Sequence, residues 1–420
     1  MTGVTSIVAA PAGTRPGAVS RRAVERASLF ILTTSAFLAL VEPSPYEFVF
    51  SIVVIVFMAS GGLRLAPSVL PLVFCVLGFG IGGFISLAPY LDEIDSVMFT
   101  LISAYMCVTT IFYAMLPRVD AEGRLEALRK GYVLAAVLAS IAGIIGYFNI
   151  AGLGEIFTRY DRAAGTFKDP NVLGTFVILP LVHLVRQLFV DRIKVLNLAA
   201  IALILFGGVF LSFSRGAWIH AIASLALMTI LTYRASRSGK VRRRIIAISV
   251  AGVATVAAAL PVALSFDAIS SIFETRASLE QSYDLGEQGR FGNQIASLPL
   301  LIERPNGFGP HRFVQYFPED PHDVFLNAFA SYGWLGGFSY LVLIIMTVAI
   351  GWRIVNADFP LRGHAIAIWS TLFIQILQGF QIDTDHWRHF WLMLGLIWGM
   401  LPMLQSPRPS EAPARTLPSA

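Results

Sequence analysis

The sequence predicts an all-α polytopic membrane protein with about 12 transmembrane helices, and composition is the first reason. Of 420 residues, 56% are hydrophobic and only 14% are charged, whereas soluble domains have roughly 25% charged residues. The second reason is that apolar residues fall in twelve separate stretches, with one long polar segment, 267–323, between the ninth and the tenth. We therefore expect one membrane domain over 27–404 with a single large external loop.

Each predicted span can cross the hydrocarbon core, which needs about 20 apolar residues, or fewer when polar side chains at its ends reach the interface. The ranges are 27–41, 46–60, 67–90, 96–116, 131–150, 172–190, 195–212, 215–232, 245–266, 324–351, 363–382 and 389–404. The first follows a basic segment, as in signal peptides, but we expect an uncleaved span. The polar, small-residue-rich ends, 1–26 and 405–420, should be disordered cytoplasmic tails.

Basic residues predict which face is cytoplasmic, because lysine and arginine gather in cytoplasmic loops. Clusters at 118–130, 186–194, 234–244 and 353–362 lie on the same predicted side as both termini. The formal charge of +5 does not indicate a nucleic-acid partner, because these clusters lie between apolar runs, as in loops that contact anionic lipid. Cys75 and Cys107 lie inside apolar runs and should be packing residues.

Several arginines lie in predicted external segments, although basic residues normally gather in cytoplasmic loops. Binding of an anionic ligand explains these arginines better than membrane insertion does. Arg159 and Arg162 precede Asp169, the expected start of the sixth span, where a helix N-terminus could help to bind a phosphate. Alternatively, Asp169 only caps the helix and the arginines meet lipid headgroups. Arg215 lies between two apolar runs, and an ionisable group at membrane depth indicates function. Its neighbour Ser214 could simply cap the following helix.

The polar segment 267–323 holds the candidate general base. Arg290 precedes 291–303, whose helical spacing of apolar residues is typical of a helix on a membrane surface. His322, just before the tenth span, could accept a proton near neutral pH, because histidine has an unperturbed pKa of about 6.5. A lone histidine at a helix start is more often structural, and His311 is a second candidate for the same role.

A further polar cluster, 383–389, contains residue types that bind metals. Asp385 and His389 are four residues apart, but zinc normally has three or four ligands in a defined geometry. The cluster also lies in a short interfacial turn beside Trp387. We therefore expect headgroup contact or a supporting role beneath the site, and neither a metal nor another cofactor.

Taken in order, these motifs resemble the O-antigen ligase and O-antigen polymerase superfamily of bacterial membrane glycosyltransferases. Each motif is weak alone, but five in the right order at matching membrane positions are much stronger. The family usually has asparagine after the histidine, where this chain has Asp323; a carboxylate there could raise the basicity of the histidine or indicate a displaced register. The matching segments are Arg162–Phe167 with Pro170–Asn171, Ser214–Gly216, Arg290, Pro305–Gly309, and His322 followed by Leu326 and Tyr332–Gly337.

The resemblance implies glycan transfer from undecaprenyl diphosphate to a sugar hydroxyl, at the periplasmic face of the bacterial inner membrane. Arg215 and Arg290, with Arg162 and Arg159, would hold the diphosphate and the charge of the leaving group. His322 would deprotonate the acceptor, with Asp323 and His311 in supporting positions. Attack from the face opposite the diphosphate would invert the anomeric centre.

The acceptor could be lipid A core, as for an O-antigen ligase in lipopolysaccharide assembly, or another lipid-linked unit, as for an O-antigen or exopolysaccharide polymerase. The late position of the large loop slightly favours the ligase. A flippase or exporter could also present arginines to a lipid diphosphate, but a carrier should place charges along a path through several helices.

Overall fold

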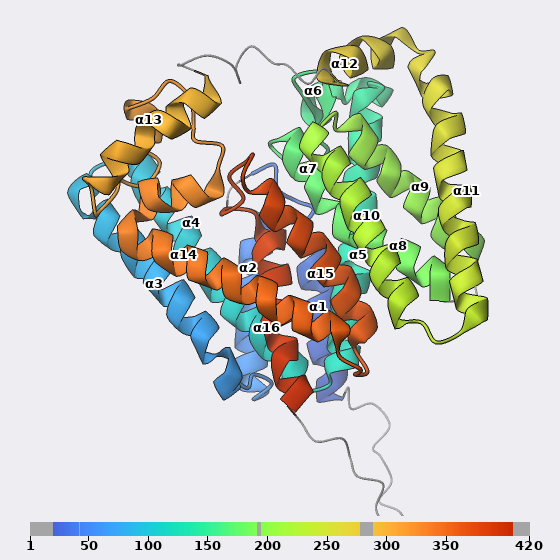
Figure 1. Ribbon diagram of the computed structural model, residues 1–420, viewed down its shortest axis with the longest axis horizontal. Helices are drawn as coiled ribbons and strands as arrows, with labels where there is room; N and C mark the ends of the chain where they lie inside the picture. Colours follow the sequence, from blue (N-terminus) through green and yellow to red (C-terminus); the bar gives the residue numbers. More distant parts are fainter. Residues whose placement is uncertain (1–19, 42, 191–194, 278–288, 406–420) are drawn as a thin grey trace, which may run out of the picture.

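The computed structural model describes residues 20–41, 43–190, 195–277 and 289–405, which form an almost entirely helical bundle (Figure 1). The α-helices are α1 (Arg21–Ser35), α2 (Pro45–Ala59), α3 (Leu70–Leu87), α4 (Ile94–Met115), α5 (Ala121–Tyr147), α6 (Gly154–Phe157), α7 (Pro170–Phe176), α8 (Ile178–Val190), α9 (Val195–Leu211), α10 (Arg215–Ala235), α11 (Gly239–Leu264), α12 (Asp267–Ala277), α13 (Arg290–Ile302), α14 (Val324–Asn356), α15 (Arg362–Gln378) and α16 (Arg388–Gln405). Short 3₁₀ helices are η1 (Pro67–Val69), η2 (Ala88–Tyr90), η3 (Leu116–Arg118), η4 (Ile150–Gly152) and η5 (Phe313–Gln315), and β1 (Thr158–Arg159) pairs antiparallel with β2 (Arg162–Ala163).

Every predicted span overlaps a helix, and the protein is a polytopic membrane protein. Within the described ranges, seven helical segments are long and apolar enough to span a bilayer, and α2 and α9 are shorter apolar helices. The seven are Pro67–Tyr90, Ile94–Arg118, Ala121–Tyr147, Pro170–Val190, Arg215–Ala235, Gly239–Leu264 and Val324–Asn356. That all twelve predicted ranges cross the membrane stays a prediction.

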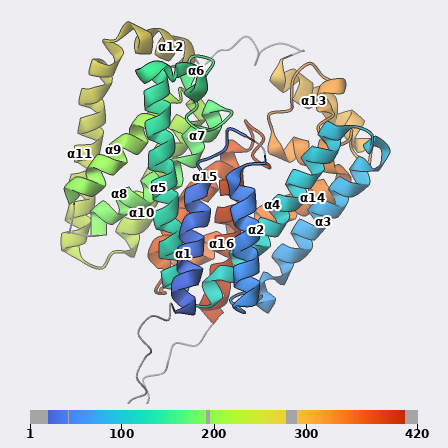
Figure 2. The same cartoon turned by 180° about the vertical axis from the view of Figure 1, so that it is seen from behind.

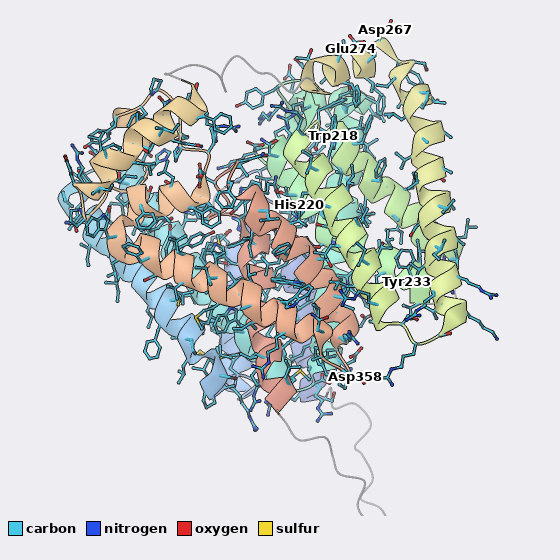
Figure 3. The ribbon with its side chains drawn as sticks, in the orientation of Figure 1. Trp218, His220, Tyr233, Asp267, Glu274 and Asp358 are labelled. Atoms are coloured by element: carbon cyan, nitrogen blue, oxygen red, sulfur yellow. The ribbon has the colours of Figure 1, made fainter. Side chains whose placement is uncertain are left out.

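The bundle has two opposite faces that carry the loops. Figures 1 and 2 place the start of α1 and the end of α16 at one face, called here the lower face, and α6, α12 and α13 at the opposite, upper face. Figure 3 shows the same division, with Asp267 and Glu274 at the upper face and Tyr233 and Asp358 at the lower face. The segments that carry the predicted site residues all lie at the upper face.

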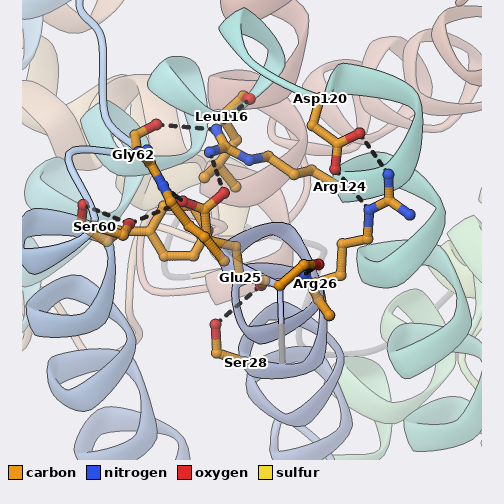
Figure 4. Close-up of polar contacts among 12 residues, drawn as sticks. Glu25, Arg26, Ser28, Ser60, Gly62, Leu116, Asp120 and Arg124 are labelled. Atoms are coloured by element: carbon orange, nitrogen blue, oxygen red, sulfur yellow. Dashed lines mark hydrogen bonds and ion pairs between the residues drawn. The ribbon is translucent and has the colours of Figure 1, made fainter. Parts of the chain in front are cut away.

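A buried ion pair joins α1 to α5 near the lower face (Figure 4). An Nη2 of Arg124 lies 2.6 Å from Oε2 of Glu25, and its Nη1 donates to the carbonyls of Gly62 and Leu116 at 3.0 Å. Both charged side chains are almost completely buried, and such a pair needs these extra hydrogen bonds to offset the loss of hydration. The helix thus begins inside 1–26, the range expected to be a tail; residues 1–19 lie outside the described ranges.

Helix α14 differs from the expected single span because it is broken at Gly333. This residue has φ 64° and ψ −171°, a conformation that is essentially restricted to glycine. The break receives the Pro305–Gly309 turn: the N–H of Trp334 donates to the carbonyl of Pro305 at 2.7 Å, and that of Phe308 to Ala330 at 2.8 Å. The two glycine-rich motifs of the sequence therefore form one packed unit.

Glycines also bring α14 close to α3. A Cβ added to Gly82 would lie 2.5 Å from the backbone nitrogen of Gly336 and 2.6 Å from the carbonyl oxygen of Tyr332. Small residues at such contacts let membrane helices approach until their backbones touch. This packing fixes the upper half of α14, which begins two positions after His322.

Candidate functional site

Arg162 contacts the turn between α9 and α10, which leads into Arg215. Arg162 is buried on β2; its Nε donates to the carbonyl of Ser212 at 2.7 Å and its Nη2 to Oδ1 of Asn171 at 2.9 Å. Arg215 is the half-buried first residue of α10, three positions after Ser212. Arg162 therefore braces the turn that presents Arg215.

The helix starts beside these arginines are capped as the sequence predicts. Oδ1 of Asp169 accepts from the N–H of Asn171 at 2.6 Å, and α7 begins at the next residue, Pro170. Oγ of Ser214 accepts from the N–H of Ala217 at 3.3 Å and caps α10. The capping interpretation is thus confirmed for both residues, but it does not account for the adjacent arginines.

Arg159 pairs with Arg162 across the β1–β2 hairpin. Its guanidinium, however, donates to backbone carbonyls close to it in the sequence. Its exposed Nη1 donates to the carbonyls of Glu155 at 2.8 Å and Thr158 at 2.9 Å. The hairpin turns through two residues with positive φ, 160 and 161, as two-residue hairpin loops commonly do. The α9–α10 turn receives Arg162 and not Arg159.

Arg290 and His322 meet at the loop between α15 and α16, residues 379–387. Arg290 is the first residue of α13, and its Nη1 donates to the carbonyl of Gln381 at 3.3 Å. The backbone N–H of His322 is close enough to the carboxyl group of Asp383 to lower the pKa of that carboxyl. One short loop therefore holds both predicted residues of the large external segment.

The C-terminal end of α15 joins the two groups. A Cβ on Gly216, next to Arg215, would lie 2.7 Å from Nε2 of Gln378. The next residue, Gly379, accepts a 2.8 Å hydrogen bond from the N–H of Val324, two positions after His322. The backbone at Arg215 and the backbone at His322 therefore pack on consecutive residues of α15 and its loop. This is the tertiary arrangement that separate sequence motifs could not reveal.

Several carboxyl groups lie near Asp383, beside the backbone of His322. Burial and the nearby Asp385, Asp320 and Asp323 hold the pKa of Asp383 well above its usual value of 3.8, although the backbone N–H of His322 opposes this shift. An acid with a raised pKa stays protonated to higher pH. Asp383 therefore stays uncharged to higher pH than an exposed aspartate would, and an uncharged carboxyl group repels an anionic ligand less than a carboxylate does.

Asp323 is the N-cap of α14. Its Oδ1 accepts from the N–H groups of Phe325 at 2.9 Å and Leu326 at 3.1 Å. Burial raises the pKa of Asp323, and these two N–H groups oppose the increase. Asparagine is an equally good N-cap, so capping explains how either residue can follow the histidine. An effect of Asp323 on the basicity of His322 stays a prediction.

His311 contacts a different part of the bundle. Its ring stacks on Phe99 of α4, with centroids 5.7 Å apart and an interplanar angle of 17°. Oγ of Ser96, on the same helix, donates to the carbonyl of Pro310 at 2.9 Å. His311 thus packs on α4, whereas His322 packs on the α15–α16 loop. Both have positive φ, 59° and 46°, so backbone conformation does not separate them, and the assignment of the base stays a prediction.

A buried polar network supports the α15–α16 loop from below. Oδ2 of Asp385 accepts from the hydroxyl of Tyr332 at 2.9 Å and from Nδ2 of Asn327 at 3.2 Å. Oγ of Ser103 lies 2.8 Å from both the Tyr332 hydroxyl and Nε2 of His386. The sequence predicts a role for the 383–389 cluster and places Tyr332 in a family motif, but it gives no signal for Ser103 and Asn327, which come from α4 and α14. In the part of the chain that the structure describes, no three His, Cys, Asp or Glu side chains gather as metal ligands do.

A protein-family model matches part of the chain. Residues 200–341 match the model of the family described as O-antigen ligase, which covers about a third of the chain. The matched range begins in α9, contains Arg215, Arg290 and His322, and ends in α14; Arg159 and Arg162 precede it. No curated protein matches the chain. The resemblance drawn from the motifs is confirmed for this range.

Proposed function

With an O-antigen ligase domain at residues 200–341 as the premise, we propose that this protein transfers a glycan from undecaprenyl diphosphate to a sugar hydroxyl of an acceptor. The family match supports action on a lipid-linked glycan. The observation that carries the proposal is that Arg215 and His322, 107 positions apart in the matched range, pack on the consecutive residues Gln378 and Gly379 through their neighbours.

The proposed reaction is a direct displacement at the anomeric carbon. The imidazole of His322 takes the proton of the acceptor hydroxyl, and the hydroxyl oxygen forms the new bond to the anomeric carbon. The bond from that carbon to the diphosphate oxygen breaks, and its electron pair leaves with undecaprenyl diphosphate. Arg215 and Arg290 stabilise the developing charge, because guanidinium groups can bind phosphate oxygens through two parallel hydrogen bonds. Attack opposite the leaving group inverts the anomeric configuration.

The motif alone indicates that Arg162 binds the diphosphate, but we propose a positioning role for it. Two of its nitrogens already bind Ser212 and Asn171, so we assign it the positioning of the Arg215 turn. Arg159 is exposed and donates to backbone carbonyls of α6 and β1, which leaves it for the outer part of the diphosphate site or for lipid headgroups.

The distribution of buried charge favours a transferase over a flippase or exporter. Among the described residues, the buried aspartate, glutamate, lysine and arginine side chains are Glu25, Arg124, Arg162 and Asp385. Glu25 and Arg124 lie in the first turns of α1 and α5, near the lower face, whereas Arg162 on β2 and Asp385 in the α15–α16 loop belong to segments between the helices. A carrier should instead place charges along a path through the membrane interior.

The glycan profile of a deletion strain separates the ligase from the polymerase. We favour the ligase, for which the strain should accumulate polymer on its lipid carrier and lipid A core without O-antigen. A core that carries single repeat units would instead show a polymerase. An unchanged profile, with lipid-linked precursors retained at the cytoplasmic face, would overturn both and support the flippase.

Cysteine labelling tests the proposed periplasmic orientation. In a Cys75→Ala, Cys107→Ala background, exposed upper-face positions such as Arg159→Cys and Asp267→Cys should react with an impermeant thiol reagent in intact spheroplasts. Asp358→Cys at the lower face is the matched control and should stay unlabelled. The reverse pattern would place the site in the cytoplasm and contradict the proposal.

A further inference from the structure

Helix α13 has its polar and apolar sides reversed relative to an ordinary surface helix. Its buried residues are Asn293, Ser297 and Leu301, two of them polar. Its large apolar side chains form an exposed row at helical spacing: Phe291 is 47% exposed, Ile295 70%, Leu298 51% and Ile302 69%. At 100° per residue these four fall within about 60° of one another on the helix surface.

This exposed row contains no charge that would suit water. Residues 291–302 include no aspartate, glutamate, lysine or arginine. An exposed, contiguous apolar row of this kind marks an interaction surface. Arg290, at the start of the helix, places its guanidinium over the ring of Phe291, 4.8 Å from the centroid, and donates to the carbonyl of Gln381 in the α15–α16 loop.

Contacts between α13 and α14 indicate that the apolar row of α13 faces lipid. Nε1 of Trp334 donates to the carbonyl of Leu301 at 2.9 Å, which fixes the last turn of α13 at the level of this tryptophan. Below Trp334, α14 exposes apolar side chains at helical spacing, at Leu335, Phe338, Val342 and Ile345, as a lipid-facing stripe does. Tryptophan is enriched where such a stripe reaches the headgroups. Figures 1 and 2 both place α13 at the margin of the bundle, over the upper ends of α3 and α14.

We propose that α13 is an interfacial helix whose Phe291–Ile302 row inserts into the bilayer at the level of Trp334. Interfacial helices bury their apolar face about 5–10 Å into the boundary between headgroups and acyl chains. The bilayer is the proposed occupant because the Trp334–Leu301 hydrogen bond holds the end of α13 beside the residue at which the exposed α14 stripe begins. This lipid contact does not depend on glycan transfer; that it holds Arg290 at the depth of a lipid-linked diphosphate rests on the proposed function.

Depth-dependent fluorescence quenching tests this inference. In the Cys75→Ala, Cys107→Ala background, bimane is attached at Ile295→Cys, at Phe338→Cys on the α14 stripe, or at Glu319→Cys, an exposed position in the same external segment. The protein is placed in phosphatidylcholine nanodiscs with or without lipid that carries a nitroxide on the acyl chain. Quenching at 295 should match that at 338 within about twofold and clearly exceed that at 319.

Quenching at position 295 no greater than at 319 would overturn the inference, because the row would then face water. A blue-shifted but unquenched signal that disappears in nanodiscs with one protein molecule would overturn it in favour of a second copy of the chain. Leu298→Cys repeats the measurement if the first variant does not fold. Loss of activity in Arg290→Ala without any change in quenching at 295 would concern the proposed function alone.

Discussion

Replacing Arg162 with lysine should separate a positioning role from direct binding of substrate. The guanidinium donates to Ser212 at 2.7 Å and to Asn171 at 2.9 Å while 6% exposed. A hydrogen bond from a charged donor contributes about 1.5–3 kcal/mol. The single nitrogen of lysine can keep one of these two bonds, so Arg162→Lys should lower the free energy of unfolding by about 1.5–3 kcal/mol.

The assay is unfolding of the purified protein in detergent, measured together with the binding of the lipid-linked donor. Arg159→Lys is the matched control, because Arg159 pairs with Arg162 in the same hairpin but is exposed. This control should lower the free energy of unfolding by less than about 0.5 kcal/mol. If Arg162→Lys were as stable as the wild type and still lost donor binding, Arg162 would contact the diphosphate and the bracing role would be refuted.

Three further changes test the support of the site. Asp323→Asn should unfold at nearly the wild-type temperature, whereas Asp323→Ala should lose about 1 kcal/mol, because asparagine still caps α14; equal losses would contradict the capping role. Gly333→Ala should lose at least about 2 kcal/mol, since its Cβ would lie 2.6 Å from the carbonyl oxygen of Pro305, whereas Gly252→Ala, with open space around it, should be neutral or slightly stabilising. The pKa of Asp383 in the folded protein lies above its usual value. The contribution of this carboxyl to the free energy of unfolding is therefore fully present below pH about 3.9, and it is lost as the pH rises through the folded pKa. When the unfolding temperature is measured against pH, it should fall less for Asp383→Asn than for the wild type as the pH rises. Parallel curves for the two proteins would contradict the raised pKa.

Much of the helical architecture follows from apolar periodicity, because a chain in lipid must satisfy its backbone hydrogen bonds within helices. Periodicity also predicts α13, expected at 291–303 and found at Arg290–Ile302. It places the start of α5 too late, at 131 instead of Ala121. The first turns of that helix are polar, and Arg124 is buried there because Glu25 of α1 neutralises it.

The candidate site is less predictable, because its residues come together through tertiary contacts. Local chemistry is enough to select Arg215, Arg290 and His322, each at the start of a helix or next to one. It does not show that Gln378 and Gly379 connect the segments of Arg215 and His322, since an amide and a glycine at a helix end carry no functional signature. For the same reason, the network of Ser103, Tyr332 and Asp385 becomes visible only when α4, α14 and the α15–α16 loop are packed together.

The most direct test of the proposed chemistry is the rate of glycan transfer in proteoliposomes, with a saturating undecaprenyl diphosphate-linked donor and a soluble sugar acceptor. His322→Ala should reduce this rate by about 10²–10⁴, the usual contribution of a general base, while donor binding stays near the wild-type level. His311→Ala is the matched control and should lower the rate only a few-fold, because its ring packs on Phe99. Retained transfer in His322→Ala together with loss in His311→Ala would contradict the assignment of His322 as the base.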